Sequence, residues 1–278
     1  MTGTPAGETV ELHPVEVDLL CVFAEVDPPF PLDVPSTGTT EAERRLMFHA
    51  ACAQLAARGL ADRRGPCGPA AAFVRMLHAG GGAVDLALAG PQRSLGAVAL
   101  IDGLRALLVT QSPDEPGRIV RLAELTVDDA VHELLAMVPA VVAAGVPPFT
   151  LPLRPVRQVF GLITRPHRAD AGLGVARRPL SDAGMDDLLR ECGVDERTAG
   201  RLAGNLREVV GSGQAGAARR TGGHGGWRRL GDDLRWIDTG RGRFRLSQHD
   251  DSEWASVNPL ARNDVRSVLR ELAARVRS

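Results

Sequence analysis

The sequence contains no lysine and no tyrosine, so all 33 of its basic side chains other than histidine are arginines. Without lysine the chain cannot form a Schiff base with a carbonyl substrate. It also lacks the lysine that a P-loop uses to bind phosphates. Arginine stays charged at physiological pH, and its planar group suits fixed contacts with carboxylates. The missing lysine therefore excludes several classes of enzyme and directs attention to ion pairs and interfaces.

Cysteine is also scarce, and its spacing excludes the usual cysteine-based sites. No two of the four cysteines form a C-x-x-C pair, so we predict reduced thiols with neither a disulfide nor a metal site. The sequence also has no H-E-x-x-H motif and no nucleophile elbow. We therefore predict that the protein is not an enzyme, has no catalytic residues and needs no cofactor. The four cysteines are Cys21, Cys52, Cys67 and Cys192.

Long hydrophobic runs are absent as well. The longest apolar runs, such as residues 137–146, fall well short of the roughly 20 residues that a membrane-spanning helix needs. Residues 1–9 lack the basic and apolar parts of a signal peptide. The net charge of −1 is not that of a dedicated nucleic-acid-binding protein. We predict a cytoplasmic protein with no membrane span, for which nucleic acid is an unlikely partner.

The apolar pattern of the first half predicts helices followed by a series of strands. Thr40 and Glu43 have the spacing of a capping box, which starts a helix that ends at about Arg58, before Gly59. Thr126 is the expected N-cap of the helix that closes this half. The other predicted elements are an edge strand at 9–12, helices at 15–25, 69–78 and 127–138, and strands at 84–89, 97–101, 106–110 and 119–124.

The second half, after a hinge at 145–148, repeats this order with different lengths. Helices are predicted at 155–162, 181–192 and 195–210. Strands follow around Trp236, around Phe244 and at 254–257, and Asn263 is the expected N-cap of the last helix. Helices, then strands in series, then a helix predict an α+β fold with a mainly antiparallel sheet.

Two stretches of the chain resemble each other. Residues 97–111 and 234–248 both have the pattern strand, Ile-Asp, turn, strand, Gln, at a nearly constant offset (238 − 102 = 136; 248 − 111 = 137). The helices that follow share the apolar spacing i, i+3, i+4, i+7 and i+11, counted from Val127 and from Val265. We infer a single domain of two pseudo-repeats, at about 1–143 and 144–278, with pseudo-two-fold symmetry.

The most distinctive stretch is 211–251, which contains glycine-rich turns and eight of the arginines. Gly211, Gly213 and Gly216 match a dinucleotide fingerprint as a string, but they follow a predicted helix, so we interpret them as a helix end and a flexible turn. Asp102 and Asp238 end matching strands; turn capping is favoured over a catalytic pair.

The arginines allow three interpretations: a solvated sheet face with cross-strand ion pairs, a protein-recognition face, or the wing of a winged-helix DNA-binding protein. They are Arg219, Arg220, Arg228, Arg229, Arg235, Arg241, Arg243 and Arg245.

At this point the chain resembles a known family, the EspG proteins of actinobacterial type VII (ESX) secretion systems. The resemblance covers essentially the whole chain. It rests on the segments Val10-Glu11-Leu12, Thr39 to Arg44, Ala57-Arg58-Gly59-Leu60, Val84-Asp85-Leu86, Gly213-Gln214-Ala215-Gly216, Ile237-Asp238-Thr239-x-x-Gly242-Arg243-Phe244, and Pro259 before the last helix.

The resemblance implies a twisted, mainly antiparallel central sheet flanked by helical bundles. It also implies a cytosolic, non-enzymatic chaperone that keeps a secreted helical-hairpin protein soluble, either a PE–PPE-like heterodimer or another ESX substrate. In the family a loop between early strands and the C-terminal helical part bind the partner, and here the candidate loop is 90–96. The alternative is a winged-helix-like regulator, and a monomer or homodimer is expected. The candidate partner-binding residues are Pro91, Gln92, Arg93, Ser94, Trp227, Arg228, Arg229, Arg241, Arg243 and Arg245.

Overall fold

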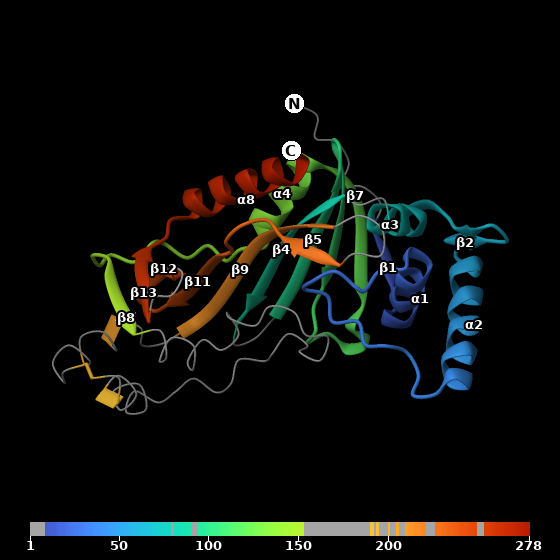
Figure 1. The fold of residues 1–278 in the computed structure, drawn as a ribbon, viewed down its shortest axis with the longest axis horizontal. Coiled ribbons are helices and arrows are strands. Elements are labelled where there is room, and N and C mark those ends of the chain that lie inside the picture. Colours follow the sequence, from blue (N-terminus) through green and yellow to red (C-terminus); the bar gives the residue numbers. More distant parts are fainter. Residues whose placement is uncertain are drawn as a thin grey trace.

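One long antiparallel sheet organises the molecule (Figure 1). The structure is a computed structural model that describes residues 9–78, 81–90, 94–152, 190–191, 193–194, 200, 204–205, 209–220, 226–248 and 253–278. All pairs of named strands in the described residues are antiparallel, as the sequence predicts. In spatial order the strands are β1 (Val10–Leu12), β7 (Val120–Thr126), β6 (Arg105–Gln111), β5 (Ser94–Asp102), β4 (Gly82–Ala89), β9 (Val209–Arg220), β11 (Leu234–Thr239), β12 (Gly242–Gln248), β13 (Trp254–Pro259) and β8 (Phe149–Pro152).

Two short pieces complete the strands. The strand β10 (Trp227–Arg229) pairs with β9 beside the start of β11, and β2 (Ala61–Asp62) and β3 (Gly65–Pro66) form a separate hairpin. A short 3-10 helix, η1 (Pro116–Arg118), connects β6 to β7. The central pair of the sheet is β4 with β9, which joins the first half of the chain to the second.

Helices cover both faces of the sheet. On one face α4 (Val127–Met137) and α8 (Arg262–Arg277) lie next to each other and bury the apolar side chains of both halves (Figure 1). On the other face α3 (Gly68–His78) packs on the first half of the sheet, α1 (Pro14–Ala24) packs beside α3, and α2 (Glu41–Ala57) packs against α1. A third cluster, around Ile237, Phe244 and Val257, lies on the second half. The α+β fold predicted from the sequence is confirmed.

The sequence signals for the first half hold in the structure with small changes at the ends of elements. Thr40 caps α2 by accepting from the backbone N–H of Glu43, and Thr126 caps α4 by accepting from that of Asp129. The Glu43 carboxylate accepts from the backbone N–H and the hydroxyl of Thr39. The predicted edge strand is β1, and the four predicted strands are β4, β5, β6 and β7. The cysteines Cys21, Cys52 and Cys67 are free, and Cys192 lies outside the described residues.

The second half contains two corrections. The helix predicted at 195–210 is wrong at its end, because Val209 and Val210 open the long strand β9. Asn263 lies inside α8, whose N-cap is Ala261, with the Asp264 carboxylate accepting from the backbone N–H of Ala261 at 3.0 Å. The helices predicted at 155–162 and 181–192 lie outside the described residues, except that 190–191 are helical.

The strand order is the same in both halves when it is read outward from the central pair. From β4 it runs through β5, β6 and β7 to β1, and from β9 through β11, β12 and β13 to β8. The strand β7 leads into α4, and β13 leads into α8. Both helices lie on the same face of the sheet. This matched order supports the pseudo-two-fold repeat, which we keep as a prediction.

Candidate functional site

The glycines that match the dinucleotide string are part of a central strand. Gly211, Gly213 and Gly216 lie in β9, which pairs with β4 on one side and with β11 on the other. The interpretation as a helix end and turn is therefore wrong. The buried ring of Trp236 packs directly over Gly213, so that a Cβ there would overlap it. These glycines serve close packing within a sheet, since a nucleotide fingerprint must follow a strand and open a helix.

Two of the eight arginines bind the ends of helices. Arg219 donates to the backbone carbonyl of Val276 at 2.8 Å, at the end of α8. Arg220 donates to the carbonyl of Leu77 at 2.8 Å, at the end of α3. The last carbonyls of a helix lack partners within the helix and carry partial negative charge, which a guanidinium satisfies. These arginines tie the sheet to its helices and are not arranged as a surface that would bind phosphates.

A third arginine is in the core. Arg243 is 0% exposed and donates to both carboxylate oxygens of Asp238, at 2.6 Å from Nε and at 2.9 Å from a terminal nitrogen. It also donates to the carbonyl of Pro139 at 3.0 Å and stacks 5.5 Å from the Trp236 ring. Arg243 therefore cannot contact a partner in this conformation, and its prediction as a surface residue is corrected.

The turn-capping interpretation of Asp238 is also corrected. In the hairpin register Asp102 closes its turn opposite Arg105, and Thr239 closes the matching turn opposite Gly242. The structural offset is thus 137 (239 − 102), and Asp102 corresponds to Thr239. Since alternate residues of a strand face opposite sides, a shift of one residue turns the Asp238 side chain into the core. Thr239 caps this turn instead, accepting from the backbone N–H of Arg241 at 3.1 Å.

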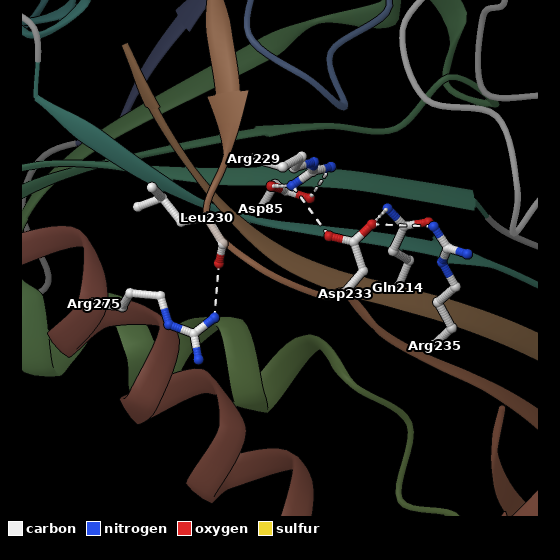
Figure 2. A network of polar contacts seen from close by, with 7 residues as sticks. All are labelled: Asp85, Gln214, Arg229, Leu230, Asp233, Arg235 and Arg275. Carbon is white, nitrogen blue, oxygen red and sulfur yellow. Dashed lines mark hydrogen bonds and ion pairs between the residues drawn. The ribbon is translucent and has the colours of Figure 1, made fainter. Parts of the chain in front are cut away.

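A polar network occupies the middle of the sheet on the face away from α4 and α8 (Figure 2). Asp85, buried in β4, binds the Arg229 guanidinium through both oxygens. Asp233 lies 3.7 Å from the same guanidinium and also accepts from Gln214 at 3.0 Å and from Arg235 at 3.4 Å. The charges of the two carboxylates and the two arginines cancel. The interpretation as ion pairs therefore accounts for these two arginines.

The remaining arginines, Arg228, Arg241 and Arg245, are exposed. Strand register places Arg241 and Ser94 at the same end of the central strands, because Ala89 pairs with Ser212 while Thr239 pairs with Val209, near the start of β9. Trp227 lies at the other end of these strands, where it pairs with Arg220 at the end of β9. The predicted partner-binding residues therefore do not form one continuous surface. Pro91, Gln92 and Arg93 lie outside the described residues.

A groove of about 630 Å³ opens beside Ser94, at the edge where the β4–β5 hairpin ends. We call it the hairpin-edge groove. Several of its polar side chains already have partners: Arg121 binds Glu115 at 2.8 Å and Ser112 donates to the carbonyl of Ser94 at 3.0 Å. The groove thus offers mainly apolar contact. Its apolar lining includes Leu88, Leu95, Ala136, Met137, Val141 and Val210.

Sequence reasoning missed this groove. Its walls come from six separate segments: the β4–β5 hairpin, the end of β6 with the loop after it, the start of β7, the end of α4 with the chain after it, the start of β9 and the end of β11. Val210, which is 47% exposed at the groove, was assigned to a helix. The signal that could have found it is the run Val209-Val210-Gly211-Ser212, which has the β-branched composition of a strand start.

Neither a metal site nor a membrane-spanning helix emerges from the part of the chain that the structure describes. No three His, Cys, Asp or Glu side chains of these residues gather in a way that could hold a metal ion. None of the described helices is both long enough and apolar enough to cross a bilayer.

One of the comparisons with known proteins identifies a family, and another identifies a shared fold. The model of the EspG family matches residues 13–271. The curated proteins give no match. Among solved structures, the chain is similar to EspG5, the type VII secretion system chaperone of Mycobacterium tuberculosis in complex with a PE25–PPE41 dimer, with a TM-score of 0.60, 13% sequence identity and 95% of each chain covered. At this identity the likeness shows that the two chains share a fold.

Proposed function

The chain belongs to the EspG family, and we propose that it is a cytoplasmic, non-enzymatic chaperone that binds a type VII secretion substrate of the PE–PPE kind. The observation that carries this proposal is the family match over residues 13–271. The shared fold supports it, because the similar solved structure is a chaperone bound to a PE25–PPE41 dimer.

The hairpin-edge groove has the character that such a function needs. A secreted helical hairpin with an apolar tip aggregates unless the tip is covered. A covering surface needs an apolar centre with a polar rim and no unpaired buried charge. Leu88, Leu95 and Val210 provide apolar lining, while Arg121 at the groove is already paired with Glu115.

We propose a contact surface that combines this groove with the neighbouring loops. Ser94 and the exposed Arg241 lie at the same end of the central strands as the groove. The loop positions Pro91, Gln92 and Arg93, predicted from the sequence, adjoin Ser94 in the chain. We leave out Arg229 and Arg243, which bind carboxylates. We also leave out Trp227 and Arg228, which pair with the opposite end of β9.

The first test is a mild affinity purification from the native cytosol, with mass spectrometry of the proteins recovered. The expected result is a small helical pair of the PE–PPE kind, at one copy of the pair per chaperone by light scattering. The same measurement gives the oligomeric state of the free chain, predicted to be a monomer or homodimer. Recovery of no such pair, together with unchanged aggregation of PE–PPE-type pairs from the same genome on co-expression, would refute the proposal.

A matched pair of variants tests the surface. Val210→Asp places a charge at the groove, and we expect it to weaken partner binding at least tenfold, by about 1.4 kcal/mol or more. Leu104→Asp is the control, because Leu104 is an exposed aliphatic residue (72%) on the β5–β6 turn, away from the groove. Equal affinities of the two variants, both with unchanged far-UV circular dichroism, would place the contact elsewhere.

A further inference from the structure

Residues 227–233 run beside β9 as a short segment that leads into β11. The β10 part pairs with β9 for only three residues, from Trp227 opposite Arg220 to Arg229 opposite Ala218. The chain then turns at Gly231, where φ is +84°, and enters β11 at Leu234. We call residues 227–233 the strap.

Specific polar contacts hold the strap against the sheet, as Figure 2 shows. Arg229 binds the Asp85 carboxylate in β4 and lies over the Phe30 ring at 5.1 Å. Asp233 accepts from Gln214 of β9 at 3.0 Å. On the other side the carbonyl of Leu230 accepts from Arg275 of α8 at 2.7 Å. The strap is thus attached at both faces of the sheet by groups that water could also satisfy.

The closed strap also carries unfavourable terms. Asp85 is only 2% exposed, and an ion pair that closes over a buried carboxylate must offset its desolvation. Among the described residues, four buried side-chain atoms have no hydrogen-bond partner, and three of them belong to the strap or to the next strand: Trp227 Nε1, Asp233 Oδ1 and Arg235 Nε. Each such atom costs free energy that opening to water would recover. These costs oppose the contacts that hold the strap closed, which also include the packing of Trp227 and Leu230 on the core and the hydrogen bond from the Leu230 N–H to the Ala217 carbonyl (2.9 Å).

We propose that the strap opens and closes over Asp85, and that binding of a proton by the network favours the closed state. This device belongs to the chain itself and does not depend on the proposed function. The charged groups that act on Asp85 are Arg229 and Asp233 of the strap, and Arg235 of β11 reaches the network through Asp233.

The direction of the pH effect follows from the burial of Asp85. Burial raises the pKa of Asp85 from 3.8 to about 6; Arg229 opposes this shift and Asp233 adds to it. With the strap open, water would return the pKa of this carboxyl toward 3.8. The closed state therefore holds the proton more tightly, and opening becomes more favourable as pH rises from about 4 to above 6. Between pH 5 and pH 8 the opening equilibrium should increase about tenfold.

Hydrogen exchange of the chain alone tests the proposal. The backbone amides of 227–233 are compared with those of β6 and β7 from pH 5 to pH 8, after correction for the intrinsic exchange rates. We expect protection of the strap to fall about tenfold over this range, while β6 and β7 do not change. A flat profile for the strap would overturn the proposal, whatever the outcome of the partner-binding experiments.

Two variants show which carboxyl carries the effect. In Asp85→Asn the pH dependence of strap protection should disappear, because no proton is taken up on closing. Asp102→Asn is the control, since Asp102 is exposed at the end of β5, and its profile should match that of the unmodified chain. An unchanged pH dependence in Asp85→Asn would also overturn the proposal. If this variant does not fold, the profile of the unmodified chain alone decides.

Discussion

Arg243 is the residue whose replacement should cost the most stability among the arginines of the second half. It is fully buried and binds both oxygens of Asp238, so Arg243→Met leaves an uncompensated buried carboxylate. We expect a loss of about 3–5 kcal/mol in the free energy of unfolding, measured by chemical denaturation. Arg245→Ala, two residues along the same strand but exposed, should change it by less than about 0.5 kcal/mol.

The double variant Asp238→Leu with Arg243→Met separates the stability that the ion pair contributes from the cost of leaving one charge unpaired. Apolar residues of similar volume can replace a buried ion pair with little loss, so the double variant should be more stable than Arg243→Met alone. If the single variant instead matches Arg245→Ala, the pair contributes little and Asp238 is solvated in solution.

At the scale of secondary-structure elements, β9 depends on glycine where Trp236 packs on it. Gly213→Ala puts a methyl group into the space of the buried Trp236 ring, and overpacking of this kind costs about 1–3 kcal/mol. Gly145→Ala is the control, because nothing lies within 4 Å of a Cβ at this exposed position. Thermal unfolding of the two variants should differ clearly; equal midpoints would mean that the ring can move aside without cost.

Arginine also fixes the end of α4. Arg262, in the first turn of α8, donates to the carbonyls of Val138 at 2.7 Å and Leu135 at 2.8 Å. Arg262→Ala removes two charge-assisted hydrogen bonds, and we expect a loss of about 1–3 kcal/mol by denaturant titration. Arg270→Ala, exposed on the same helix, should fall within about 0.5 kcal/mol of the unmodified chain. A loss in both variants alike would indicate a general effect of removing charge from α8.

How much of each element could be predicted depends on its side chains. The helix α4 has a capping residue, Thr126, and a clear apolar stripe, so its start followed directly from the sequence. The strand β9 could not be predicted in this way, because its middle, 211–218, consists of Gly, Ser, Gln and Ala without an alternation of apolar and polar residues. That composition is explained by what lies over it, Trp236 on one face and the Arg229 network on the other. Only the tertiary structure supplies this reason.

At the scale of the whole molecule, the sequence predicted the family and the sheet but not the site. The predicted residues come from the 90–96 loop and from the arginine-rich stretch 211–251, yet the register places Ser94 and Arg241 at the opposite end of β9 from Trp227. The hairpin-edge groove is assembled from six segments, and no local pattern connects them. Pairing of β4 with β9 is the contact that brings them together, and it joins residues more than 120 positions apart, such as Ala89 and Ser212 (212 − 89 = 123).

The same central pairing leads to a prediction about folding. The two predicted pseudo-repeats, at about 1–143 and 144–278, meet at β4 and β9, where eight residue pairs from Gly82 to Ala89 are in register. The core beneath α4 and α8 mixes side chains of both halves, such as Leu86 and Trp236. Separating the halves would expose this shared core, so neither should be stable alone. We therefore expect one cooperative transition in calorimetry, with equal calorimetric and van't Hoff enthalpies, and no folded product from residues 1–143 expressed alone. Two resolved transitions, or a folded isolated half, would show that the halves are separate domains.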